Sequence, residues 1–268
     1  MLVTFLIAFR ESLEAFLLVG ILLAYLNRIG GQRYAKWIYL GVFAGLIGAL
    51  VVAFILQVVV DQFSNDLYRS VFTAAIMLIA CGMLTYMAVW MHKKSRSETE
   101  HAKEQLQSYI SAGNVIGIVM FAFISVLREG IETVLFLSAL AYGGAELSVW
   151  GGLAGLAVAL LLIYILLSGA RRVPLARFFR YSSLLLIIIA AGLLGSAVNT
   201  LQGIGAFPGP TAPLFDISNV LSDTSGVGIF LRGLFGYNAS PTPPQFGLWA
   251  VYLVVAIVIW RRGYAKKA

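Results

Sequence analysis

The chain has 268 residues, of which 60% are hydrophobic and 12% are charged, and its mean hydropathy is +0.90. A soluble domain lacks the polar residues to cover so much apolar surface, so the composition predicts an all-α integral membrane protein that crosses the bilayer several times. The net charge of +7 is no sign of nucleic-acid binding, because the placement of the basic residues matters more than their sum.

Seven apolar segments are long enough to cross about 30 Å of hydrocarbon as helices. They cover roughly residues 3–27, 37–60, 69–91, 114–140, 148–170, 181–202 and 246–261. All five tryptophans lie near segment ends, as interfacial aromatic residues do. The whole chain, 1–268, is therefore predicted to be a single transmembrane domain.

The basic residues predict the orientation. Fifteen of the 19 lysines and arginines follow the first, third, fifth or seventh segment, which places them on one side of the membrane. The opposite loops hold only Arg69 and Arg232 as basic residues, and they carry several acids. By the positive-inside rule, the N-terminus is outside and the C-terminus is cytoplasmic, as in a multi-pass protein of the cytoplasmic (inner) membrane.

The first and fourth segments each contain three charged residues. The first reads "RESLE" and holds Arg10, Glu11 and Glu14, and the fourth reads "REGIE" and holds Arg128, Glu129 and Glu132. The spacing i, i+1, i+4 places each set within about 100° of one helix face. Two carboxylates three residues apart can therefore reach the same point.

The two motifs align without a gap at an offset of 118 residues, and later landmarks recur at an offset of 110. Gly41-x-x-x-Gly45 matches Gly151-x-x-x-Gly155, and "ACG" at 80–82 matches "AAG" at 190–192. Since three spans are repeated, the second copy has the opposite orientation, a pattern of secondary transporters with a midplane site. The predicted division is repeat one (about 1–92), a cytoplasmic loop (93–112), repeat two (about 113–202), an external loop (203–245) and helix seven (246–261).

Unpaired, each charge would cost about 2.5–3.5 kcal/mol in the membrane, or roughly 15–20 kcal/mol for six. The charges must therefore face the interior and one another, and antiparallel helices would place Arg10 at the depth of Glu132 and Arg128 at that of Glu14. Two arginines and four glutamates sum to −2 when ionised, which suits a cation. Carboxylates favour Mg, Ca, Mn or iron ions, and the ligand type alone does not single out iron.

Other polar groups have two interpretations each. The charged motifs could have a purely structural role, in which they hold two helices together. Two copies with surplus carboxylates favour a transport site instead. Asp61, Asp66 and Glu146 are external acids that could gather cations or be plain solvated charge. Polar groups within spans could line a pathway or hydrogen-bond between helices; they are Thr85, Tyr86, Ser196, Asn199 and Thr200.

Two connecting stretches are long. Residues 93–112 are predicted to extend the third segment as a helix with alternating charge, which favours a solvated face over a docking role. The stretch 203–245 is rich in Gly and Pro, and its middle could form a short helix on the outer face. That region could cover the outer mouth of the pathway or dock a periplasmic partner.

The doubled R-E-x-[LI]-E motif, the seven segments and the stretch "FDISNVLSDTSGVGIFLRGLFGY" at 215–237 resemble the oxidase-dependent iron transporters over nearly the whole chain. This family includes the fungal high-affinity iron permease and the bacterial EfeU-type ferrous iron permeases. The resemblance implies iron transport with Glu11, Glu14, Glu129 and Glu132 as ligands and with Arg10 and Arg128 beside them as charge-balancing groups. Ser12 departs from the glycine of the family pattern, which Gly130 keeps.

The same resemblance implies iron as the transported substrate, no permanently bound cofactor, and a periplasmic iron-binding protein and a haem peroxidase as partners. Lipid is the surrounding medium, nucleic acid is not a partner, and the oligomeric state is left open. A transporter or exporter of another divalent metal, using the same carboxylates, is the alternative function.

Other function classes lack their residues. A retinal protein needs a lysine in the last span, and a metalloprotease needs H-E-x-x-H; the sequence has neither. A serine protease needs a Ser–His pair inside the membrane, but His92 and His101 lie at or beyond the cytoplasmic end. The single cysteine, Cys81, excludes a disulfide framework. The chain has no P-loop, so it is predicted to be a transporter that does not hydrolyse ATP, and not an enzyme.

Overall fold

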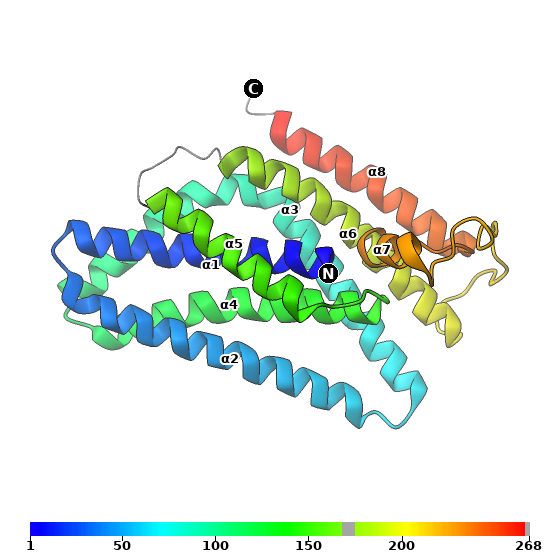
Figure 1. The fold of residues 1–268 in the computed structure, drawn as a ribbon, viewed down its shortest axis with the longest axis horizontal. Coiled ribbons are helices and arrows are strands. Elements are labelled where there is room, and N and C mark those ends of the chain that lie inside the picture. Colours follow the sequence, from blue (N-terminus) through cyan, green and yellow to red (C-terminus); the bar gives the residue numbers. More distant parts are fainter. Residues whose placement is uncertain (168–174, 266–268) are drawn as a thin grey trace. The chain divides into compact units, whose positions relative to one another are not determined.

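The computed structural model describes residues 1–167 and 175–265, and the side chains of these residues outside 90–99, 175–179 and 264–265. The described part is all-helical and contains no β-strand, as the composition predicts (Figure 1). A short 3₁₀ helix, η1 (Gln32–Tyr34), precedes the second long helix. The α-helices are α1 (Leu2–Arg28), α2 (Ala35–Gln62), α3 (Asp66–Ser111), α4 (Val115–Tyr142), α5 (Val149–Leu167), α6 (Leu175–Gly203), α7 (Gly226–Phe235) and α8 (Pro243–Ala265).

Each predicted segment coincides with one long helix as far as the structure describes it, although residues 114 and 148 lie just before α4 and α5. In the described residues, five helices are long and apolar enough to cross a membrane, namely α2, α3, α5, α6 and α8. α1 and α4 each carry a three-charge motif, so their crossing of the membrane stays a prediction. The end of the fifth segment (168–170) lies outside the described residues, as do four residues of the charge pattern, namely Arg171, Arg172, Lys266 and Lys267.

Large apolar side chains cover the outer surface of several helices. Phe54 of α2 is 70% exposed and Trp150 of α5 is 74% exposed, and α8 presents Val251 and Val254 in the same way. Water-soluble proteins rarely expose so much contiguous apolar surface, whereas lipid is a good solvent for it. The surface therefore agrees with a multi-pass membrane protein.

The described chain forms two compact units. The first consists of Met1–Val58, Lys93–Val134 and Ser148–Val173, and it holds both charged motifs. The second consists of Val59–His92, Leu135–Leu147 and Pro174–Ala268, and it holds α6, α7 and α8. The two units are described separately below.

In the first unit, glycines let α5 approach the backbone of α1 closely. A Cβ at Gly151 would lie 2.4 Å from the carbonyl oxygen of Met1, and one at Gly155 would lie 2.6 Å from that of Phe5. No side chain fits at such distances, so the small-xxx-small pair fixes the contact between these helices. Figure 1 shows α1 and α5 side by side.

The same arrangement recurs between α2 and α4. A Cβ at Gly41 would lie 2.4 Å from the carbonyl oxygen of Val119, and one at Gly45 would lie 2.9 Å from that of Phe123. These oxygens are 118 residues from those of Met1 and Phe5, and the glycines are 110 residues from Gly151 and Gly155. The two helix pairs thus repeat the offsets seen in the sequence, which supports the predicted repeat.

The second half of α3 packs into the first unit. Ala102 and Leu106 are buried in one apolar cluster with residues of α1, α2 and α4, namely Leu22, Leu26, Ile38, Ala122 and Ile118. Gln107 accepts a hydrogen bond from the Tyr25 hydroxyl at 2.9 Å. The predicted extension over 93–112 is helical to Ser111. Among its residues from 100 onward, Ala102 and Leu106 are buried while Glu100, His101 and Glu104 are exposed.

In the second unit, α6 contacts both α7 and α8. A Cβ at Gly192 would lie 2.5 Å from the backbone nitrogen of Gly236, which ends α7 in a left-handed conformation. Side-chain hydrogen bonds join α8 to α6 and α3: the Trp260 indole donates to the Ser183 hydroxyl at 2.9 Å, and the hydroxyls of Tyr252 and Thr85 are 2.5 Å apart.

Candidate metal site

The first motif lies on one turn of α1, in the first unit. The Arg10 guanidinium pairs with Glu11, and its Nη2 lies 2.8 Å from Glu14 Oε1. Because residues four apart share a helix face, the arginine reaches both acids without leaving its own helix. Arg10 and Glu11 are each only 2% exposed, so this charge pair is fully buried.

The second motif repeats this arrangement on α4. Arg128 Nε donates to Glu132 Oε1 at 3.1 Å, and its Nη2 lies 3.5 Å from Glu129 Oε1. The environment differs from that of the first motif, because the Arg128 side chain is 51% exposed while the side chains of Glu129 and Glu132 are 14% and 10% exposed. The acids of the second motif are therefore buried and its arginine reaches the surface of the described structure.

The two helices bring three carboxylates together. Glu11, Glu129 and Glu132 each offer one oxygen, and these oxygens all lie within 4.8 Å of one another. One oxygen of each carboxylate, Oε2, is buried and accepts no hydrogen bond from any described residue. Buried acceptors are normally satisfied, so three converging carboxylates that each keep an unsatisfied buried oxygen form a candidate cation site.

The donor set defines what this cluster can bind. All three ligands are hard carboxylate oxygens from rigid helices, a set that suits Mg²⁺, Mn²⁺ or Fe²⁺ more than the soft ions that prefer sulfur. The nearby Arg10 guanidinium offsets part of the negative charge. The cluster can therefore replace part of the water shell of a divalent cation, and it does not supply a nucleophile or a redox group.

Glu14 has a different place from the other three glutamates. The sequence predicts four glutamates as ligands, but the group of three does not include Glu14, which is paired with Arg10. Each arginine contacts glutamates of its own motif, and the pairing across the helices stays a prediction. Local i, i+4 geometry thus accounts for these contacts.

The external acids Asp61, Asp66 and Glu146 are all exposed. Asp66 begins α3, where a carboxylate interacts favourably with the helix dipole, and the side chain of Asn65 caps the same helix by accepting from Leu67 N at 2.9 Å. None of the three belongs to a metal-ligating group within the described part of the chain. Their gathering of cations stays a prediction.

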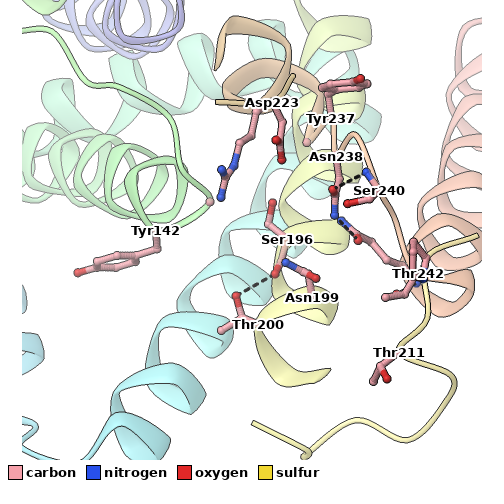
Figure 2. A pocket seen from close by; sticks show the side chains of 15 residues that line it. Tyr142, Ser196, Asn199, Thr200, Thr211, Asp223, Tyr237, Asn238, Ser240 and Thr242 are labelled. Atoms are coloured by element: carbon pink, nitrogen blue, oxygen red, sulfur yellow. Dashed lines mark hydrogen bonds between the residues drawn. The ribbon is translucent and has the colours of Figure 1, made fainter. Parts of the chain in front are cut away.

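The polar groups within the spans separate into two sets. Thr85 hydrogen-bonds between helices through Tyr252, and Tyr86 is exposed. Ser196, Asn199 and Thr200 instead line a cavity of about 410 Å³ in the second unit (Figure 2). The two charged residues of the lining come from the stretch 203–245: Asp223 lies in irregular backbone, which gives no periodic signal in the sequence, and Arg232 lies on α7, the short helix predicted in the middle of this stretch.

The chain matches the model of the iron permease FTR1 family over residues 1–265. A ferrous iron permease EfeU of Escherichia coli O6:K15:H31 is 33% identical over 263 residues, which cover 96% of this chain and 94% of the relative. Similar proteins of the same name occur in Shigella sonnei, at 33% identity, and Yersinia pestis, at 31% identity over 97% of this chain and 93% of the relative. No solved structure matches the chain.

Proposed function

Because the chain belongs to the FTR1 family of iron permeases, we propose that it carries ferrous iron across the cytoplasmic membrane through the glutamates of α1 and α4. It is a membrane transporter and not an enzyme. The observation that carries the proposal is the convergence of Glu11, Glu129 and Glu132, each with a buried oxygen that no described residue satisfies.

The proposed mechanism exchanges water for carboxylate oxygens. A hydrated Fe²⁺ ion loses part of its water shell at the cluster, where Glu11, Glu129 and Glu132 replace the lost ligands. Oxygens within 4.8 Å of one another can contact one ion together, at ligand distances of about 2.0–2.2 Å, after small side-chain adjustments. Binding by three ligands and not by a closed shell leaves room for water, which allows the ion to leave again.

Arg10 balances the cluster when no ion is bound. Its guanidinium pairs with Glu11 and Glu14, so the negative charges are partly compensated in the empty site. An arriving dication competes with the guanidinium for Glu11, which frees Arg10 to pair more closely with Glu14. Glu14 is therefore proposed to hold the arginine during transport, and to join the ion only as Arg10 moves.

Removing one carboxylate without changing its size tests the cluster. In vesicles containing the purified protein, Glu11→Gln and Glu132→Gln should each reduce Fe²⁺ uptake at least tenfold, because each loses one charged ligand, an interaction of about 1.5–3 kcal/mol. Glu104→Gln is the matched control, since Glu104 is 74% exposed, lies on α3 and belongs to neither motif. It should transport like the unchanged protein.

Mn²⁺ and Zn²⁺ are compared in the same uptake assay, because carboxylate ligands alone also suit a carrier of another divalent metal. Faster uptake of Mn²⁺ than of Fe²⁺ would favour that alternative. Normal Fe²⁺ uptake by a well-inserted Glu11→Gln/Glu132→Gln double variant would overturn the glutamate pathway. The periplasmic iron-binding protein and the haem peroxidase stay predictions of the resemblance, and neither is needed in this assay.

A further inference from the structure

The second unit contains a cavity that the glutamate pathway does not use. Its volume is about 410 Å³, within the range of about 300–1,000 Å³ typical of small-molecule sites. The end of α4, one face of α6, the end of α7 and the stretch before α8 form its walls. Figure 2 shows Asp223, Ser196, Asn199 and Asn238 around one space, and Tyr142 turned away from it.

The walls are polar and are held by hydrogen bonds. Asn238 Nδ2 donates to Gln245 Oε1 at 2.9 Å, while its Oδ1 accepts from the backbone nitrogen of Ser240 at 3.0 Å. The Tyr237 hydroxyl donates to the carbonyl oxygen of Leu221 at 2.7 Å. Because these bonds fix the lining before any ligand arrives, little ordering would be needed on binding.

Two opposite charges line this cavity without partners. Neither the Asp223 carboxylate nor the Arg232 guanidinium makes a hydrogen bond or an ion pair with any residue that the structure describes. Arg232 lies in the last turn of α7 and packs against Gly144, where a Cβ would be 2.6 Å from its Nε. Gly144 has φ +91°, so the turn after α4 admits the guanidinium only because this residue is glycine.

These charges decide between ligand classes. A bare divalent cation would find one carboxylate and be repelled by the guanidinium, and the only metal-ligating group among the described residues is the set on α1 and α4, which shares no residue with this cavity. A carboxylate ligand fits better, because arginine binds carboxylates through two parallel hydrogen bonds. Ligand hydroxyls would donate to Asp223 and exchange hydrogen bonds with the side chains of Asn199 and Ser196.

We propose that the cavity lined by Asp223, Arg232 and Asn199 binds a small hydroxycarboxylate anion, the class of molecule whose hard oxygens also chelate iron. The ligand carboxylate pairs with Arg232 and its hydroxyl group donates to Asp223. This site is separate in its residues from the glutamate cluster. The role of this site in iron delivery rests on the proposed function, because the bound anion would present iron to the transporter as a chelate. Binding of the anion itself requires no transport.

Calorimetric titration of the full-length protein in lipid nanodiscs, with citrate as the probe and no metal present, tests the site. Arg232→Gln and Asp223→Asn should each weaken citrate binding about tenfold or more, since each removes a charge-assisted hydrogen bond. Tricarballylate lacks only the hydroxyl group of citrate. It should bind the unchanged protein more weakly than citrate does, whereas Asp223→Asn should bind the two molecules about equally. Arg69→Gln removes an exposed arginine outside the cavity and should bind citrate normally.

Gly144→Ala provides a second route to the same result, because its Cβ displaces Arg232 while leaving every charge in place. Citrate binding that is absent in the unchanged protein, or equally tight in folded Arg232→Gln, would overturn the proposal. Binding of Fe²⁺ alone that Asp223→Asn abolishes would also overturn it, in favour of a cation site. Glu132→Gln should bind citrate normally, so failure of this site and failure of the glutamate pathway give different results.

Discussion

Arg10 and Arg128 occupy the same place in the two motifs, yet their surroundings differ. Arg10 is 2% exposed and pairs with Glu11, which is equally buried, and with Glu14, which is 17% exposed, whereas Arg128 is 51% exposed. Removing one partner of a buried ion pair leaves an uncompensated charge, and the cost falls as the pair becomes more exposed. The two arginines therefore occupy equivalent positions in the sequence, but their contributions to the stability of the protein differ.

Neutralising each arginine checks this difference. Arg10→Gln should lower the stability of the protein by about 3–5 kcal/mol, because it leaves buried glutamates without their partner, and Arg128→Gln should lower it by less, because the Arg128 side chain is half-exposed. The thermal midpoint in detergent, followed by tryptophan fluorescence, measures both variants under the same conditions. Equal shifts would show that the burial of Arg10 has no energetic consequence.

Ser12 and Gly130 mark where the two motifs depart from each other. A Cβ at Gly130 would lie 2.4 Å from the Cβ of Ala49, so α2 can approach α4 only because residue 130 is glycine. Ser12 carries a side chain at the corresponding position of α1. The sequence predicts which carboxylates point inward, because helical spacing is local, but the helix-to-helix distance at each motif depends on residues far along the chain.

At the scale of elements, the glycine pairs are the strongest determinants of packing in the first unit. Gly41→Ala and Gly151→Ala each place a methyl group 2.4 Å from a carbonyl oxygen of the facing helix. Each should destabilise the protein by about 1–3 kcal/mol, the usual consequence of overpacking, and both should reduce iron uptake by displacing α4 or α1. Thermal unfolding and vesicle uptake measure the two effects.

Gly82→Ala is the matched control for this pair. Gly82 is also a helical glycine, but nothing lies within 4 Å of a Cβ placed there. Alanine is the better helix former, so this variant should be as stable as the unchanged protein or slightly more stable. A loss of stability as large as that of Gly41→Ala would contradict the assignment of close packing to Gly41 and Gly151.

Gly82 also shows that residues which match in the two repeats can have different contacts. "ACG" at 80–82 matches "AAG" at 190–192, yet Gly82 meets open space while Gly192 contacts the backbone of Gly236. The difference arises because α6 is followed by α7, which has no counterpart after α3. Apolar length predicted the long helices, and the short helix predicted in the middle of 203–245 is α7. The cavity instead depends on hydrogen bonds within the irregular parts of that stretch, which leave no periodic pattern.

The acids of that stretch illustrate the same limit. Hydrogen bonds from the hydroxyl and the backbone N–H of Ser218 lower the pKa of the Asp216 carboxyl below its ordinary value. Asp216 therefore stabilises a local turn, while Asp223, seven residues later, faces the cavity. Both are plain acidic residues in the sequence, and only the folded backbone separates their roles.

At the scale of the whole molecule, the orientation in the membrane follows from the placement of the basic residues and is open to direct measurement. With Cys81 replaced by alanine, single cysteines at Ser64 and Glu146 should react with a membrane-impermeant maleimide in intact cells. Cysteines at Gln32 and Ser111 should react only after permeabilisation. All four positions are exposed, so accessibility reports the side of the membrane and not burial.

The opposite labelling pattern would place the N-terminus in the cytoplasm and overturn the positive-inside assignment. Labelling of Ser64→Cys and Ser111→Cys from the same side would mean that α3 does not cross the membrane. The prediction of seven crossings depends on α1 and α4, whose charged motifs separate them from ordinary apolar spans. α1 crosses the membrane if a cysteine at Leu2, which is 48% exposed, labels from the same side as Ser64 while Gln32 labels from the opposite side. α4 crosses it if Ser111 and Glu146 label from opposite sides.

The pairing of each arginine with glutamates of its own helix has a consequence for biosynthesis. α1 leaves the ribosome more than a hundred residues before α4, so it meets the membrane without its eventual neighbour. Since Arg10 is already bonded to Glu11 and Glu14, most of its charge is compensated during insertion, when charged side chains are most costly. Each half of the cluster can thus enter the bilayer alone, and the surplus negative charge becomes a shared site only when the second half arrives.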